Sequence, residues 1–185
     1  MPLADNQKDK LALSPGPEKS PVARVITVAF SAYVFAVLSA GASPASADSL
    51  SRSLDVNGAP SEVWSAIGPF CAIKDWLPPV GSCTEDGKTP PTRTLVTKDG
   101  SATFVETQTA RSDERRSYSY TFKSSPLPLT RYTSTIEVTA KGPSQSTVTW
   151  SSTYTPNEGK EKEAKDALSG IYAAGLNAIE ARFAK

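Results

Sequence analysis

Histidine is absent from this sequence of 185 residues. Without it the chain cannot form the Ser-His-Asp and Cys-His systems that activate serine and cysteine nucleophiles. The commonest metal ligand is missing as well, and the two cysteines are too few to build a tetrahedral zinc site by themselves. We therefore expect neither a metal ion nor a cofactor.

An excess of one charge is also lacking. Lys and Arg total 20, Asp and Glu total 19, and the formal net charge is +1. A nucleic-acid-binding protein would carry a basic excess on one face, so we expect no nucleic-acid partner. Apolar residues make up 38% of the chain, which is enough for the core of one domain.

The amino-terminal segment has the three parts of a secretory signal peptide. A long polar region that contains Lys19 and Arg24 precedes an uncharged apolar run, and Ala45 and Ala47 then form an Ala-x-Ala cleavage site. We expect residues 1–47 to be a signal peptide that is cleaved after Ala47. Residues 48–185 would then be a single exported domain, located in the periplasm.

The alternative is an uncleaved membrane anchor. Residues 25–47 contain no charged side chain and are numerous enough to span a bilayer as a helix. In that case the membrane would be a partner of the protein. The small residues and the proline at the end of the segment favour cleavage.

Cys71 and Cys83 both fall in the predicted exported domain. In an oxidising compartment an even number of cysteines suggests a disulfide. A loop of this size closed by a disulfide contributes about 3 kcal/mol in the chain-entropy model. The alternative is a pair of buried free thiols.

The first part of the exported domain predicts one strand and two short helices. Residues 50–56 favour a strand, and Pro60 suits the first turn of a helix over residues 61–67. Gly68 and Pro69 end that helix, and a second short helix is expected over residues 70–76.

Five later segments are rich in Thr, Val and aromatic residues and predict strands, over residues 92–97, 103–109, 117–123, 130–140 and 147–154. Short turns, of which Asp99-Gly100 is the clearest, join most of them and predict an antiparallel meander. Alternation puts aromatic side chains on one face and hydroxyl side chains on the other. We therefore expect the aromatic face of the sheet to be covered and the hydroxyl face to be exposed to solvent.

The last segment, residues 161–184, has apolar residues at helical spacing and predicts a long helix that covers the sheet. Gly170 and Gly175 each lower the stability of such a helix by up to about 1 kcal/mol relative to alanine. They either pack tightly on the sheet or leave room for another group to approach.

Nine short stretches, taken in their order along the chain, carry a resemblance to a known family. They are Pro60–Gly68, Phe70–Trp76, Arg93–Leu95, Asp99-Gly100, Glu106, Tyr118–Tyr120, Leu127-Pro128, Tyr132 and Val148–Trp150. In this order the sequence resembles the SRPBCC superfamily of START-like and birch-pollen-allergen-like proteins, in its polyketide cyclase/dehydrase-like branch. The resemblance implies an α+β helix-grip fold, in which a curved antiparallel sheet of six or seven strands wraps around the long last helix. It also implies a cavity for a lipid-like or polycyclic small molecule.

One departure from this family bears on catalysis. Many members have His-Pro after the tryptophan, whereas this chain has Leu77-Pro78 after Trp76. The family histidine that could act as a base is therefore missing. Exported members often carry the same cysteine pair.

Glu106 is the one candidate catalytic residue. It shares a predicted strand face with Phe104 and Gln108, and Arg93 on the neighbouring strand could be its partner. A buried carboxylate needs such a partner or a raised pKa. Glu106 is either a polar anchor or general base in a pocket, or part of a structural ion pair, or, with the opposite strand parity, exposed to water.

Aromatic and polar residues of the covered face are the candidate ligand-binding set. A ligand pocket would use the same face as the core, so each of them could also be plain core. The set comprises Trp76, Arg93, Phe104, Glu106, Tyr118, Tyr120, Tyr132, Trp150, Tyr154 and Tyr172.

Three functions fit these observations. The first is a non-catalytic exported binding or carrier protein for a hydrophobic small molecule, which the absence of histidine favours. The second is a cyclase or dehydratase that works through Glu106 and tyrosines. The third is an accessory protein that docks on an exported dehydrogenase or electron carrier through an exposed apolar rim at Leu77 and residues 127–129.

Overall fold

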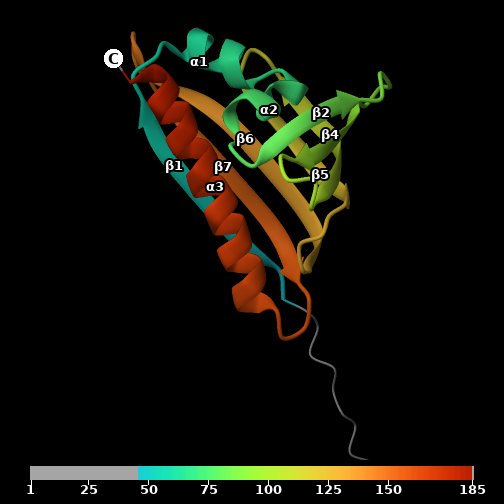
Figure 1. Ribbon diagram of the computed structural model, residues 1–185. Coiled ribbons are helices and arrows are strands. Elements are labelled where there is room, and N and C mark those ends of the chain that lie inside the picture. The colour runs from blue at the N-terminus through green and yellow to red at the C-terminus, as the bar shows by residue number, and fades with distance from the viewer. Residues whose placement is uncertain (1–45, 185) are drawn as a thin grey trace, which may run out of the picture. The chain divides into compact units, whose positions relative to one another are not determined.

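The computed structural model describes residues 46–184, which contain one seven-stranded antiparallel sheet (Figure 1). The strands are β1 (Asp48–Val56), β2 (Val80–Glu85), β3 (Thr92–Thr97), β4 (Thr103–Ser112), β5 (Ser117–Ser124), β6 (Leu129–Gly142) and β7 (Gln145–Pro156). Their order in the sheet is β1-β7-β6-β5-β4-β3-β2. The sheet is therefore a meander from β2 to β7, with β1 added beside β7.

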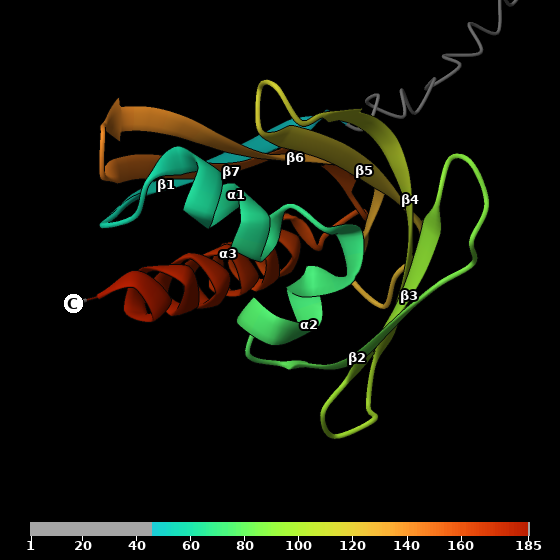
Figure 2. The same cartoon turned by 90° about the horizontal axis from the view of Figure 1, so that it is seen from above.

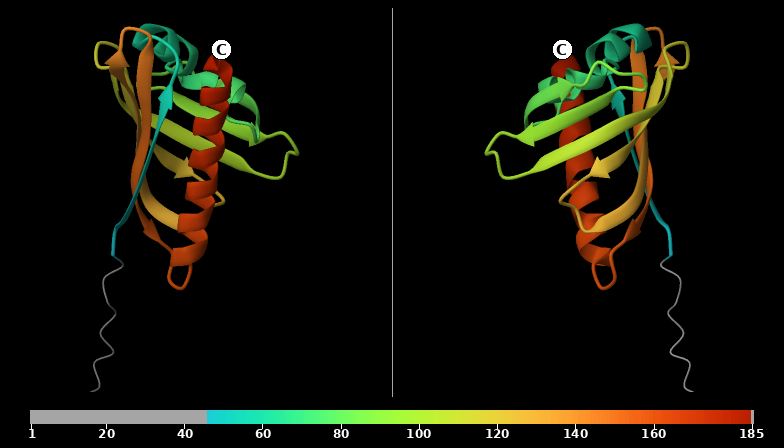
Figure 3. Two further views of the ribbon diagram at one scale, coloured as in Figure 1. Left: turned by 90° about the vertical axis from the view of Figure 1, so that its left-hand side faces the viewer. Right: turned by 90° about the vertical axis from the view of Figure 1, so that its right-hand side faces the viewer.

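The helices lie on the concave side of this sheet, as the view from above shows (Figure 2). They are α1 (Pro60–Ile67), the 3₁₀ turn η1 (Phe70–Ala72), α2 (Ile73–Trp76) and α3 (Glu161–Phe183). The side views show the sheet curving around α3 (Figure 3). The expected α+β helix-grip fold, with short helices after the first strand, is confirmed.

Two local features differ from the sequence-based expectation. The second short helix begins as the 3₁₀ turn η1 and becomes α-helical only at Ile73. Strand β2 has no counterpart among the expected strands, because its sequence, VGSCTE, lacks the apolar alternation of the others. Pairing with β3 gives this segment its extended conformation.

The two faces of the sheet separate by side-chain chemistry, as expected. The inner face is aromatic and apolar, and Tyr118, Tyr120 and Trp150 are each at most 2% exposed. On the outer face, one row of directly paired residues crosses six strands and consists entirely of hydroxyl side chains, namely Ser49, Thr153, Thr133, Thr121, Thr107 and Thr92. Alternation with a period of two produces this separation.

The two glycines of α3 have different surroundings. A Cβ added at Gly175 would lie 2.8 Å from the Trp150 ring and 3.1 Å from both Leu77 and Trp76, whereas one added at Gly170 would meet no atom within 4 Å. Tight packing therefore explains Gly175, and the rest of the fold makes no such demand at Gly170.

We expect Gly170→Ala to raise the free energy of unfolding by up to about 1 kcal/mol, because alanine favours the helix and fits the open space. Gly175→Ala gains the same propensity but forces buried indole rings apart, at about 1–3 kcal/mol for overpacking. Urea denaturation of both variants measures the difference. Equal effects of the two substitutions would contradict the packing explanation.

The predicted signal peptide and the alternative membrane anchor lie outside the described residues, apart from their last two positions. Within residues 46–184, no helix has the length and apolarity needed to cross a membrane.

Candidate ligand-binding cavity

A cavity of about 160 Å³ lies between the sheet, α2 and α3. Its wall is almost wholly apolar, and among residues 46–184 Glu106 is the only charged residue in it. The lining residues are Ile73, Leu77, Pro79, Val80, Leu95, Thr97, Ala102, Phe104, Glu106, Tyr120, Phe122, Tyr132, Trp150, Leu168 and Ile171. Small-molecule pockets have the same composition, an apolar wall with a few polar groups.

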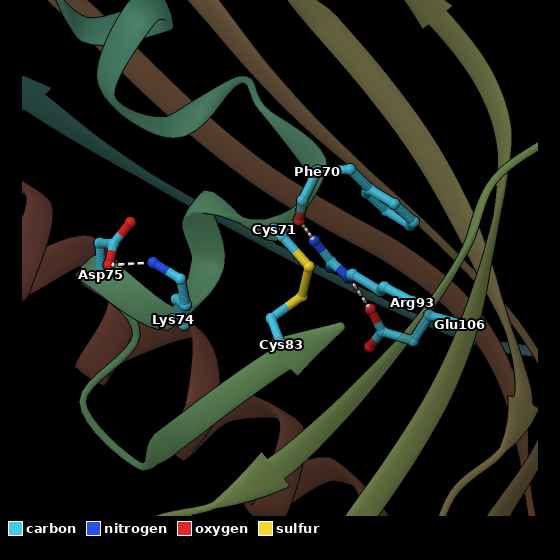
Figure 4. The surroundings of a disulfide bond; sticks show 7 residues. All are labelled: Phe70, Cys71, Lys74, Asp75, Cys83, Arg93 and Glu106. Carbon is cyan, nitrogen blue, oxygen red and sulfur yellow. Dashed lines mark hydrogen bonds and ion pairs between the residues drawn. A yellow bond between two sulfur atoms is a disulfide. The ribbon is translucent and has the colours of Figure 1, made fainter. Parts of the chain in front are cut away.

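Glu106 is held in this wall by a buried ion pair with Arg93. The two residues are direct cross-strand partners on β4 and β3, and Arg93 Nε donates to Glu106 Oε2 over 2.6 Å. The side chain of Arg93 is 0% exposed and that of Glu106 is 5% exposed. Arg93 Nη1 also donates to the carbonyl oxygen of Phe70, so the guanidinium links two strands to η1 (Figure 4).

Aromatic rings complete the surroundings of the guanidinium. The Arg93 Cζ atom lies 4.0 Å from the ring centroid of Phe70 and 5.0 Å from that of Tyr120. Such cation–π contacts partly replace the water that Arg93 lost on burial. The remaining nitrogen, Nη2, has no hydrogen-bond partner within the described residues.

Burial raises the pKa of the Glu106 carboxyl, and the charge of Arg93 opposes that rise. Burial alone would lower the pKa of Arg93, but the neighbouring Glu106 carboxylate raises it overall. Arg93 therefore stays cationic, and any change of charge at this site occurs on Glu106. Glu106 Oε2 is the oxygen engaged by Arg93, and Oε1 has no partner in residues 46–184.

The structure decides the strand parity left open for Glu106, which points inward and not into water, and shows its ion pair with Arg93. A role of Glu106 as polar anchor or general base stays a prediction. The same carboxylate also lines the cavity. Glu106 therefore both pairs with Arg93 and lines the cavity.

A network of hydroxyl and indole groups lies behind the aromatic wall. Trp150 Nε1 donates to Ser134 Oγ over 2.9 Å and lies 3.1 Å from the Tyr120 hydroxyl. The Tyr172 hydroxyl is 2.7 Å from that of Tyr132 and 3.0 Å from Ser134 Oγ, and its ring stacks on Trp150 with centroids 4.2 Å apart. These contacts fix α3 against the sheet.

Burial raises the pKa of Tyr120 and of Tyr132 well above the ordinary value. Both phenols are therefore protonated at neutral pH and can donate a hydrogen bond to a ligand or to each other. A tyrosine base would need the opposite shift. The tyrosines of this cavity are thus suited to binding.

The structure brings together half of the residues that the sequence predicts to bind a ligand. The cavity wall contains Phe104, Glu106, Tyr120, Tyr132 and Trp150. The others are absent from it: Arg93 pairs with Glu106, Tyr172 stacks on Trp150, Tyr118 and Tyr154 are buried in the core, and Trp76 lines a separate groove. Binding of a ligand by any of these residues stays a prediction.

The disulfide between Cys71 and Cys83 is present, with Cα atoms 5.5 Å apart. It joins η1 to β2, directly beside the Phe70 carbonyl that accepts from Arg93 (Figure 4). The alternative of two free thiols is thereby excluded.

The apolar rim expected at Leu77 and residues 127–129 is wrong for Leu77 and Leu129, whereas Leu127 and Pro128 are half-buried. Leu77 is only 6% exposed and Leu129 only 8% exposed. Both side chains turn inward, Leu77 into the cavity wall, because the core offers them more apolar contact than the surface does.

Within the described residues, no group of three or more His, Cys, Asp or Glu side chains could hold a metal ion.

The family model for polyketide cyclase/dehydrase and lipid transport proteins matches residues 47–184. The chain belongs to this family. No curated protein matches its sequence significantly. The protein XoxI from Bacillus cereus, whose structure is known, is 35% identical, with a TM-score of 0.69 over 73% of this chain and 94% of that one.

Two enzymes share the fold of this polyketide cyclase/dehydrase-family domain. Norcoclaurine synthase from Thalictrum flavum, in complex with dopamine and hydroxybenzaldehyde, is 18% identical, with a TM-score of 0.60 over 73% of this chain and 85% of that one. The Zhui aromatase/cyclase from a Streptomyces species is 13% identical, with a TM-score of 0.61 over 74% of this chain and 93% of that one. At these identities the likeness extends to the fold alone.

Sequence reasoning missed the aliphatic part of this family domain's cavity. Ile73, Leu77 and Val80 come from α2 and the segment after it, and Leu168 and Ile171 come from α3. The apolar stripe of the last helix contained the last two, but an apolar stripe alone does not separate core from cavity wall.

Proposed function

We propose that the domain is an exported binding or carrier protein for a compact hydrophobic small molecule, held between the sheet and α3. The observation that carries this proposal is the cavity itself, whose wall is apolar apart from Thr97, the two tyrosines and one buried carboxylate. The raised pKa of both tyrosines and the absence of histidine favour binding over catalysis. Export is supported by the signal-like amino-terminal sequence.

The cavity volume limits the size of the ligand. At about 160 Å³, it is close to an engineered apolar cavity of about 150 Å³ that binds benzene. The ligand that fits is therefore one aromatic ring or a short alkyl chain. A polycyclic or long-chain ligand would require side chains such as Leu77 or Leu168 to move.

Native mass spectrometry of the freshly purified protein, together with calorimetric titration, tests this function. We expect a co-purified or exchangeable ligand, measurable binding of toluene-sized molecules, and weaker binding of anthracene-sized ones. The proposal fails if the protein neither retains nor takes up any hydrophobic molecule.

The free oxygen of Glu106 predicts a preference for ligands with a hydrogen-bond donor. We expect 4-ethylphenol to bind about tenfold or more tightly than ethylbenzene, since a hydrogen bond to a charged group is worth about 1.5–3 kcal/mol. Calorimetric titration of the unmodified protein with both ligands measures the ratio, so no variant needs to fold.

The pH dependence of that ratio identifies the carboxylate as its cause. Because burial raises the pKa of Glu106, the carboxyl becomes protonated as the pH falls through this raised value, and the charge-assisted hydrogen bond is lost. The preference for the phenol should therefore shrink at acidic pH. A ratio near one at neutral pH, or a ratio independent of pH, would count against Glu106 as the polar anchor.

A second candidate function is a cyclase or dehydratase in which Glu106 acts as general base. One observation favours it: a carboxyl whose pKa is raised by burial in an apolar cavity takes up a proton more readily than an exposed carboxyl does. Turnover of small aromatic polyketide-like substrates that disappears in Glu106→Gln, with the variant still folded, would support it. Absence of turnover by the unmodified protein excludes it for those substrates.

A further inference from the structure

A second hollow, of about 630 Å³, lies between α2, the turn after β3 and the carboxyl-terminal part of α3. We call it the basic groove, and its lining residues are Lys74, Asp75, Trp76, Leu77, Pro78, Lys98, Ala178, Ala181 and Arg182. Ala178, Ala181 and Arg182 share one side of α3 at helical spacing. The two alanines leave the space that forms the hollow.

The charges around the basic groove are mostly positive. It contains three cations and one carboxylate, and Lys74 Nζ pairs with Asp75 over 2.7 Å (Figure 4). Lys98 and Arg182 form no ion pair with any residue in the described range 46–184. Two cations thus remain for a ligand. Trp76 also lines the basic groove, and its buried indole N–H has no acceptor in the same range.

The basic groove and the cavity are separated by a wall one residue thick. Leu77 lines both of them. Pro78 lines the groove and the adjacent Pro79 lines the cavity. In the same way, Lys98 lines the groove and the adjacent Thr97 lines the cavity. The amide of Lys98 donates to the carbonyl oxygen of Pro79 over 2.9 Å, which joins the two segments of this wall.

We propose that the basic groove binds the anionic end of an amphipathic small molecule whose hydrocarbon part occupies the cavity. The ligand class is a carboxylic acid with a short alkyl chain or a single ring. The chain would reach the groove when the Leu77 side chain moves aside, and its carboxylate would lie between Lys98 and Arg182. This inference rests on the proposed function, because it specifies the ligand of the same cavity.

The cavity alone would select against such a ligand. Glu106 is the one charged residue that the described part of the chain contributes to its wall, and it disfavours a second negative charge nearby. A preference for an anion over the uncharged molecule of the same length therefore requires cations outside the cavity wall. Lys98 and Arg182 are the cations that the structure places there.

Calorimetric titration with octanoate and octanol tests the proposal. We expect octanoate to bind about tenfold more tightly at low salt, the effect of two exposed ion pairs, and we expect added salt to reduce this ratio. In the Lys98→Gln/Arg182→Gln variant, octanoate affinity should fall to that of octanol or below, and octanol affinity should not change. Lys98 and Arg182 are exposed, as are the two residues changed in the control variant described next, so we expect both variants to keep the fold.

The matched control is Lys88→Gln/Lys165→Gln. It removes the same charge from exposed positions outside the basic groove and should leave both affinities unchanged. Equal binding of octanoate and octanol, or an equal loss in both double variants, overturns the basic-groove proposal. If neither C8 ligand binds but toluene does, the basic-groove proposal fails and the carrier function stands. If toluene does not bind either, the carrier function fails, so the two failures are distinguishable.

Discussion

Arg93→Met will lower the free energy of unfolding by about 3–5 kcal/mol, the usual effect of removing one partner from a buried ion pair. The methionine fills much of the space of the arginine but leaves the Glu106 carboxylate in an apolar wall without a cation. The Phe70 carbonyl also loses its donor. Urea denaturation followed by tryptophan fluorescence measures the change.

The control for Arg93→Met is a second cross-strand ion pair. Lys141 pairs with Asp55, and both side chains are about half exposed. Lys141→Met should change the free energy of unfolding by about 0–1 kcal/mol, because water already screens this pair. Similar losses in the two variants would show that the Arg93 pair is no more important than a surface pair.

The double variant Arg93→Met/Glu106→Leu separates the worth of the pair from the penalty of an unpaired charge. Replacing both partners of a buried pair with apolar side chains is often neutral or stabilising. We therefore expect the double variant to recover most of the loss. A double variant as unstable as Arg93→Met would place the cause in packing.

Removing the disulfide, by Cys71→Ala with Cys83→Ala, should lower the free energy of unfolding by about 3 kcal/mol, through the entropy that the unfolded chain regains. The bridge also lies next to the Phe70 carbonyl that accepts from Arg93. Urea denaturation with and without a reductant measures the change in the free energy of unfolding.

Reduction supplies the control for the cysteine variant. The reductant should lower the stability of the unmodified protein to nearly that of the variant and should leave the variant unchanged. If the unmodified protein were equally stable in both conditions, the disulfide would contribute nothing to its stability.

Periodic features of this fold were predictable from the sequence. Regular alternation predicted where the strands lie and which of their faces is buried. It placed Glu106 on the same face as Phe104 and Gln108 but left open whether that face points inward, as it does. The order of strands, short helices and long last helix then identified the fold. Local pattern is sufficient where one face of an element is buried over its full length.

Features that arise from contacts between distant segments were not predictable. β2 has a strand conformation because β3 lies beside it. The cavity volume depends on how Leu77, Trp150 and Leu168 pack against one another. The basic groove joins Lys98 and Arg182 from opposite parts of the domain. No local periodicity encodes such juxtapositions.

The pairing of β1 with β7 determines when this domain can fold. Asp48 pairs with Tyr154, so the first strand to leave the ribosome has no partner until nearly the whole domain has been synthesised. Hairpins from β3 to β7 form between neighbours, whereas closing this longest loop is slow. Until then, β1 and β7 each present an unpaired edge that can associate with other chains. A chain that ends before β7 therefore cannot complete its sheet, however well its earlier hairpins form.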